Sequence, residues 1–114
     1  MKPINEPSTE ILNRIGALAT TNGGHIKIDN TEAVFIPLSV EWLTGEELTI
    51  CHYSECNGDL MCNPEVIFTV KNGEYFPHYF RNDFAGIEQE NANRAGLVEF
   101  CEMWLSNIQD QQGI

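Results

Sequence analysis

The stretch LTICHYSECNGDLMCNPEVIFTVKNGEYFPHYF, residues 48–80, decides the fold. Three runs in it are rich in branched and aromatic residues, at residues 48–54, 66–70 and 75–80. Asn57-Gly58 and Asn72-Gly73 separate these runs. Asn-Gly is typical of tight type I′ turns, because both central residues of that turn need a positive φ. The stretch therefore predicts antiparallel strands that follow one another in a meander.

Two more strands are expected before this stretch. Residues 25–29 alternate polar and apolar side chains, and residues 33–43 are rich in branched and aromatic ones. Pro37 indicates a sheet edge or a bulge, because proline has no amide hydrogen for the ladder. A turn is expected at residues 44–47. Residues 81–90 are less regular, and no element is assigned to them.

Apolar residues at helical spacing flank the strands on both sides. The first set predicts a helix over residues 8–20 and consists of Ile11, Leu12, Ile15, Leu18 and Ala19. Ser8 is the expected cap, and Asn22-Gly23-Gly24 is the expected stop. The second set predicts a helix over residues 91–108 and consists of Leu97, Cys101, Trp104, Leu105 and Ile108. Residues 109–114 are expected to fray.

The two apolar helix stripes each need a surface, and one face of the sheet supplies it. We therefore predict an α+β fold in two layers, with a four- to five-stranded antiparallel sheet flanked by an N-terminal and a C-terminal helix. A chain of 114 residues suits a single domain over residues 1–114.

The composition indicates a globular protein of the cytoplasm. Apolar residues make up 42% of the chain, and no apolar run is long enough for a transmembrane helix. The N-terminal residues lack the basic and apolar regions of a signal peptide. In the cytoplasm the four cysteines, Cys51, Cys56, Cys62 and Cys101, are expected to be free thiols.

The charge of the chain is strongly acidic. Six basic residues stand against seventeen acidic ones, which gives a formal net charge of −11. Such a charge repels nucleic acids and anionic membranes, so we expect no direct binding of either. It attracts a basic surface on another protein, although it can also serve solubility alone.

Residues 52–65 carry the side chains best suited to chemistry. His52 titrates near neutral pH, and Asp59 and Glu65 could orient it as an acid–base group. A small-ligand or hydrolytic site would combine these three with Asn57 and Asp83. The alternative is a structural hairpin, in which Asp59 bonds back to the amides of the turn that it follows.

A zinc site at Cys51, Cys56 and Cys62 is the less favoured alternative. These cysteines lack the paired C-x2-C spacing of structural zinc sites. Cys51 and His52 are neighbours on a strand, so they point to opposite faces. The chain also lacks the phosphate-binding and hydrolase motifs, and we expect no cofactor.

The runs HYSECNGDLMCNPEVIF (residues 52–68) and PHYFRNDFAGIEQE (residues 77–90) resemble a small domain of uncharacterised function. This domain occurs in bacterial, phage and mobile-element proteins, often near plasmid-transfer or antirestriction modules. The matching positions are His52, Tyr53, Asn57, Gly58, Asp59, Leu60, Met61, Pro64, Glu65, Pro77, Tyr79, Asp83, Gly86 and Gln89.

The resemblance implies a context rather than an activity. Small acidic accessory proteins of phages often block host defence by covering a basic surface. Asn63 stands where the pattern has an acid, so any chemistry of that acid would be lost here. Cys56 and Cys62 are not part of the pattern.

The leading hypothesis is therefore a binding protein that inhibits a host defence nuclease, of the CRISPR or restriction type, by covering its nucleic-acid-binding surface. The expected binding residues are Glu46, Glu47, Glu55, Asp59, Glu88 and Glu90. One alternative is the small-ligand or hydrolytic site at His52, Asp59, Glu65 and Asp83. Another is a homodimeric accessory domain without catalysis.

Overall fold

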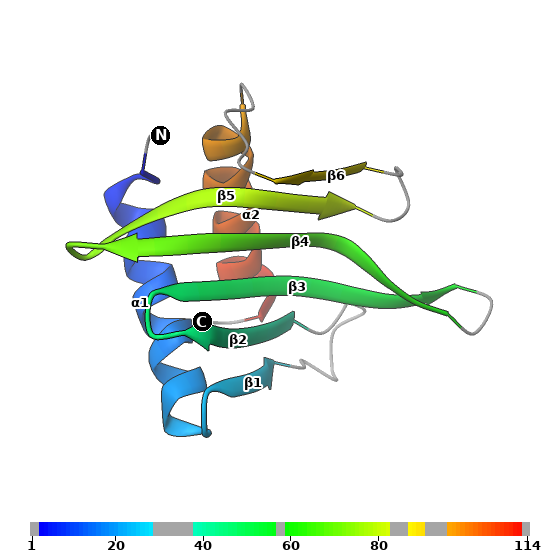
Figure 1. The fold of residues 1–114 in the computed structure, drawn as a ribbon, viewed down its shortest axis with the longest axis horizontal. Coiled ribbons are helices and arrows are strands. Elements are labelled where there is room, and N and C mark those ends of the chain that lie inside the picture. Colours follow the sequence, from blue (N-terminus) through cyan, green and yellow to red (C-terminus); the bar gives the residue numbers. More distant parts are fainter. Residues whose placement is uncertain (1–2, 29–37, 57–58, 83–86, 91–95, 113–114) are drawn as a thin grey trace.

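A computed structural model describes residues 3–28, 38–56, 59–82, 87–90 and 96–112 (Figure 1). Within these residues, one helix precedes and one helix follows six strands along the sequence. The elements are α1 (Glu6–Thr21), β1 (His25–Ile28), β2 (Leu38–Thr44), β3 (Glu47–Cys56), β4 (Asp59–Lys71), β5 (Glu74–Asn82), β6 (Ile87–Glu90) and α2 (Leu97–Gln112).

The strands form one antiparallel sheet in the order β1-β2-β3-β4-β5-β6. This order confirms the predicted meander and the α+β class. The described sheet has six strands, where four or five were expected, because β6 pairs with β5. Its sequence, Ile-Glu-Gln-Glu, has a single apolar residue and so gave no alternating pattern.

Asn72-Gly73 forms the predicted turn between β4 and β5. Asn72 has φ +53° and Gly73 has φ +77°, as a type I′ turn requires. Asn57-Gly58, the other expected turn, and Pro37 lie outside the described residues. Gly23 and Gly24 also have positive φ, which agrees with their expected role at the end of the first helix.

The helix ends differ from the expected ones in three places. One is the start of α2, which is Leu97, directly after Gly96 at φ +91°, and not residue 91. The cap of α1 is Asn5 and not Ser8, because the Asn5 Oδ1 atom accepts a hydrogen bond of 3.0 Å from the Ser8 amide. Pro7 stands in the first turn, where its missing amide hydrogen costs no helical bond. α2 continues to Gln112, so residues 109–112 are helical rather than frayed.

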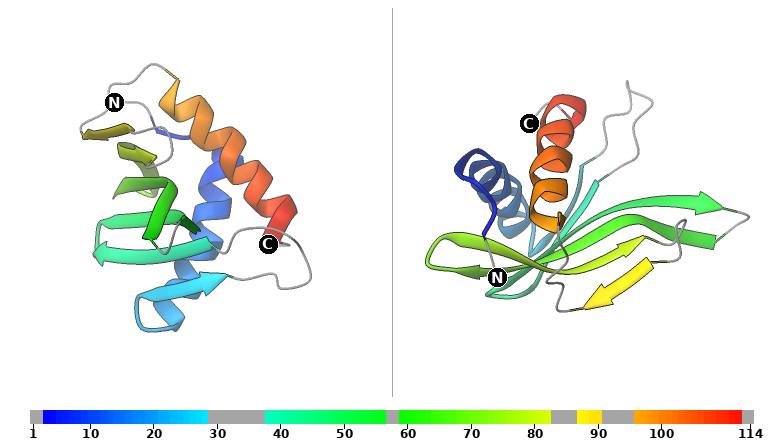
Figure 2. Two further views of the ribbon diagram at one scale, coloured as in Figure 1. Left: turned by 90° about the vertical axis from the view of Figure 1, so that its right-hand side faces the viewer. Right: turned by 90° about the horizontal axis from the view of Figure 1, so that it is seen from above.

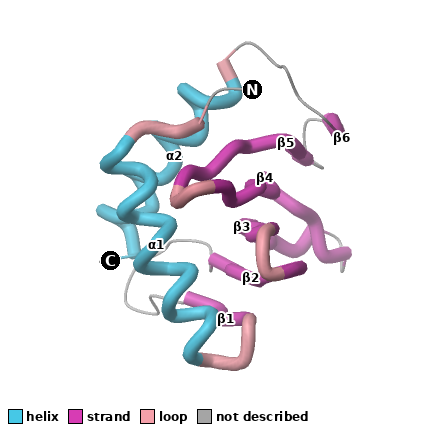
Figure 3. The backbone as a smooth tube through the Cα atoms, turned by 60° about the vertical axis from the view of Figure 1, so that its left-hand side comes forward, coloured by secondary structure: helices cyan, strands magenta, loops and turns pink. Residues whose placement is uncertain are grey.

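Both described helices pack on the same face of the sheet, and neither lies on the opposite face, which we call the helix-free face (Figures 2 and 3). The core between the two layers contains fully buried side chains from both, which include Leu12, Ile15, Ile50, Phe68, Leu105 and Ile108. Each such side chain contributes about 1.5–3 kcal/mol by leaving water. This two-layer arrangement was predicted.

Close polar contacts fix α1 to the sheet. The Trp42 indole Nε1 donates a hydrogen bond of 3.0 Å to the Gly16 carbonyl oxygen. A Cβ atom at Gly16 would lie 3.1 Å from the Trp42 ring, so a larger residue there would require the ring to shift by a few tenths of an ångström. The Tyr75 hydroxyl donates a hydrogen bond of 2.8 Å to the Asn13 Oδ1 atom.

None of the described helices is long and apolar enough to cross a membrane.

β3 and β4 continue beyond the rest of the sheet as a two-stranded arm (Figure 1). The pairing of β2 with β3 ends at Leu38↔His52, and that of β4 with β5 ends at Glu65↔Arg81. Past these pairs, residues 53–56 pair with residues 59–62 and with no other described strand. The arm therefore begins where the predicted catalytic residues His52 and Glu65 stand.

Candidate functional site

Successive residues of β3 lie on opposite faces of the sheet. Leu48 and Ile50 belong to the core beneath the helices. Thr49 and Cys51 line a depression on the helix-free face. This alternation follows from the strand's period of two, and it separates Cys51 from His52 as predicted.

His52 lies on the helix side. Its ring is 5.4 Å from that of Trp104 on α2, at an interplanar angle of 89°. The side chain is 8% exposed, and its Nε2 atom has no hydrogen-bond partner among the described residues. Burial lowers the pKa of His52 below the ordinary value of 6.5, so the ring is neutral at physiological pH.

The register of the sheet shifts at His52. Cys51 pairs with Glu65, whereas Tyr53 pairs with Cys62, so Asn63 and Pro64 together stand opposite the single residue His52. This is a bulge on β4, and a proline is tolerated there because the ladder is already interrupted. The bulge explains why the sequence can place Asn63-Pro64 inside a long strand.

Glu65 lies on the helix-free face. Its Oε2 atom accepts a hydrogen bond of 3.0 Å from the Thr49 hydroxyl, and both residues line the same depression. His52 and Glu65 are therefore on opposite faces and do not share a pocket. The Asp59 side chain, Asn57 and Asp83 lie outside the described residues.

The depression that Glu65 lines, which we call the open-face pocket, has a volume of about 140 Å³. It extends over four strands, from β1 to β4, and it is lined by His25, Ser39, Glu41, Leu43, Thr49, Cys51 and Glu65. Cys51 and His25 are not on neighbouring strands, because β2 lies between β1 and β3 and separates their backbones by about 10 Å.

Two thiols lie in the described core. Cys51 and Cys101 are buried, and neither belongs to a disulfide. Burial, and then the nearby Glu102, raise the pKa of the Cys101 thiol to about 12, so it stays protonated. The Cys56 and Cys62 side chains lie outside the described residues. Among the His, Cys, Asp and Glu side chains that the structure describes, no group of three is placed to hold a metal ion.

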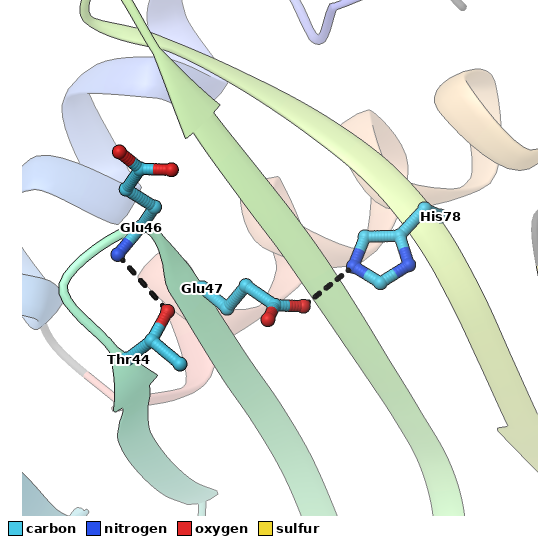
Figure 4. A network of polar contacts seen from close by, with 4 residues as sticks. All are labelled: Thr44, Glu46, Glu47 and His78. Atoms are coloured by element: carbon cyan, nitrogen blue, oxygen red, sulfur yellow. Dashed lines mark hydrogen bonds and ion pairs between the residues drawn. The ribbon is translucent and has the colours of Figure 1, made fainter.

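Two of the predicted binding residues lie near the turn between β2 and β3. Glu46 is exposed, and its amide donates a hydrogen bond of 3.2 Å to the Thr44 hydroxyl. Glu47 reaches across β4, where its Oε2 atom is 3.2 Å from the His78 Nε2 atom (Figure 4). A half-exposed pair of this kind contributes at most about 1 kcal/mol.

The other predicted binding residues are placed by their backbone only. Glu55 stands opposite Leu60 in the arm, and Asp59 stands opposite Cys56. Glu88 and Glu90 stand opposite Arg81 and Tyr79 at the β5–β6 edge. Their side chains lie outside the described residues.

Sequence reasoning missed Glu41 and Thr49 as members of a site. Glu41 is the exposed acid on β2, and in register it stands between His25 and Thr49. The polar residues that alternate with Leu38, Val40 and Trp42 were the available signal. The sequence could not supply the register that brings these residues beside Glu65.

Residues 8–114 match the family model of a domain of unknown function, DUF6908. The chain belongs to this family. No curated protein and no solved structure matches the chain. The family therefore agrees with the resemblance to an uncharacterised domain, and it assigns no activity to the open-face pocket.

Proposed function

We propose that this DUF6908 chain is a binding protein without catalysis, which covers a basic nucleic-acid-binding surface of another protein. The observation that carries the proposal is the placement of acidic side chains on a sheet face that no helix covers. Glu41, Glu47 and Glu65 belong to strands β2, β3 and β4, and the chain as a whole has a net charge of −11. Carboxylates spread over such a face present negative charge much as phosphate groups do.

The positions of the candidate catalytic residues favour binding over catalysis. His52 is buried against Trp104, while Glu65 lies on the other face. The open-face pocket, at about 140 Å³, is smaller than the roughly 300–1,000 Å³ of ordinary substrate and cofactor sites. Among the described residues, His52 and Glu65 on opposite faces and a pocket too small for an ordinary substrate suit recognition.

The class of partner is a host defence nuclease of the CRISPR or restriction type. The resemblance to domains of phages and mobile elements supports this choice, since blocking such a nuclease benefits the element that carries the gene. Nucleases of both types bind nucleic acid through basic surfaces, to which an acidic face is complementary.

The test is capture of the tagged chain's partner from a nuclease-treated lysate of the host, followed by reconstitution with the purified partner. We expect one partner whose complex weakens as salt rises from about 0.15 M to about 1 M, because screening shortens the reach of surface charges. We also expect the chain to compete with the partner's nucleic acid. A partner that binds the chain and its nucleic acid at the same time would contradict the proposal.

A further inference from the structure

We infer that the open-face pocket is the receptor for one arginine side chain of the basic partner. This inference rests on the proposed function and names the chemistry by which the same face recognises its partner. Four observations carry it: the layout of the pocket, its size, the open acceptors on its sides, and its apolar lining.

The layout places one carboxylate on each side of a floor. In register, Glu41 stands opposite Thr49, and Cys51 stands opposite Glu65. Thr49 and Cys51 on β3 are buried and form the floor, while Glu41 belongs to β2 and Glu65 belongs to β4. Glu41 and Glu65 are two strands apart, about 10 Å between backbones, so a flat, branched cation over the floor can meet one carboxylate on each side.

The size fits one side chain. A cavity of about 150 Å³ holds a molecule as large as benzene. The pocket's volume of about 140 Å³ therefore accepts a guanidinium group with part of its stem. A nucleotide or a typical enzyme substrate is too large for it.

The acceptors on both sides have capacity for a guest. The Glu41 carboxylate forms no hydrogen bond or ion pair with a described residue. Among the described residues Thr49 is the one donor to Glu65, and it bonds only the Oε2 atom. That bond also orients the Glu65 carboxylate, which reduces the entropy lost when a guest binds.

The shape of the donor set favours arginine over lysine. A guanidinium carries five N–H donors in a rigid plane, so it can bond acceptors on more than one side of the pocket. A lysine ammonium is a compact point charge and reaches fewer of them. Leu43, which is 47% exposed, offers an apolar wall for the methylene stem of the guest.

The test is a titration of the whole chain with N-acetyl-L-arginine amide, followed by the backbone amide signals in NMR spectra. We expect saturable shifts at Thr49, Cys51 and Glu65, and weaker binding of N-acetyl-L-lysine amide. Glu41→Gln and Glu65→Gln should each raise Kd about tenfold or more, because each removes a charge-assisted hydrogen bond. Glu10→Gln, an exposed acid on α1, is the charge-matched control and should change Kd by less than about twofold.

Three results would overturn the inference: no saturable shift, shifts confined to other residues, or equal affinity for the arginine and lysine probes. Glu41 is exposed, and its carboxylate has no hydrogen-bond or ion-pair partner among the described residues. Glu41→Gln therefore tests the inference even where Glu65→Gln disturbs the sheet. The arginine probe can be titrated without the natural partner, so the arginine receptor and the proposed function can be refuted independently. Arginine binding without a basic partner in the lysate would refute the proposed function alone. A captured basic partner that binds the Gln variants with unchanged affinity would refute the arginine receptor alone.

Discussion

The two faces of the sheet differ in character, although alternating residues of the same strands form both. On the helix-covered face, Ile50 and Phe68 are fully buried among apolar side chains, and the His52 Nε2 atom has no hydrogen-bond partner in the described part of the chain. On the other face, Thr49 and Glu65 bond each other and Glu41 is exposed. Apolar burial, which stabilises the fold, is therefore concentrated on one face, and exposed carboxylates lie on the other. Substitutions on the open face should change binding with little effect on stability.

The largest expected effect is on the covered face. Leu105→Ala removes a fully buried side chain of α2 and should lower the free energy of unfolding by about 2–5 kcal/mol, through lost burial and a cavity. Met103→Ala on the same helix, where the side chain is 56% exposed, should change it by less than about 0.5 kcal/mol. Denaturant unfolding of both variants measures the difference. Equal losses would contradict the assignment of α2 to the core.

The next largest effect is expected at the Asn72-Gly73 turn. This turn sets the register between β4 and β5 and thereby determines which side chains lie on which face. Gly73→Ala places a Cβ atom at φ +77° and should cost about 1–2 kcal/mol of unfolding free energy. Gly45→Ala is the control, because that glycine has no positive φ and an added Cβ would meet nothing within 4 Å. The control should be neutral or stabilising by up to about 1 kcal/mol. Thermal unfolding compares the two, and a larger loss for Gly45→Ala would show that the turns are misassigned.

His52 should make the covered face sensitive to acid. Its folded-state pKa is below 6.5, so the unfolded chain binds the proton more tightly and stability falls as the pH decreases below about 6.5. His52→Phe keeps a ring beside Trp104 and removes the titration. We expect the loss of unfolding free energy between about pH 8 and about pH 5 to be smaller in this variant than in the wild type. An unchanged or steeper loss would mean that the histidine is not buried neutral.

The smallest effect is expected on the open face. Glu47→Gln removes the carboxylate that faces His78 at 3.2 Å, with 37% of the Glu47 side chain exposed. Solvent screens such a pair, and its removal should lower the unfolding free energy by less than about 0.5 kcal/mol. Denaturant unfolding at low and high salt checks this. A loss comparable with that of Leu105→Ala would show that the open face also stabilises the fold.

Patterns that act locally made most of the fold predictable. The Asn72-Gly73 turn and the apolar stripe of α2 each depend on residues that are close in the sequence, and both are present. β6 was missed because its sequence, Ile-Glu-Gln-Glu, has a single apolar residue and so shows no alternating pattern. The true cap, Asn5, was missed because Pro7 inside the first turn looked like a residue before the helix.

The site was less predictable than the fold, because it depends on register. The sequence grouped His52 with Glu65, which are close in the hairpin, but the period of a strand places them on opposite faces. It did not group Glu41 with Glu65, which are 24 positions apart and share a pocket only through the pairing of β2, β3 and β4. The binding role of Glu46, Glu47, Glu55, Asp59, Glu88 and Glu90 stays a prediction.

The most direct test of the division between the faces is quantitative capture of the partner by two double variants with equal charge changes. Glu41→Gln with Glu65→Gln alters the open face, and Glu10→Gln with Asp110→Asn alters exposed acids of the helix layer. We predict that the first variant loses most of the partner while its free energy of unfolding changes by less than about 1 kcal/mol, and that the second retains the partner. Equal retention by both variants, or loss only from the helix-layer variant, would contradict the account.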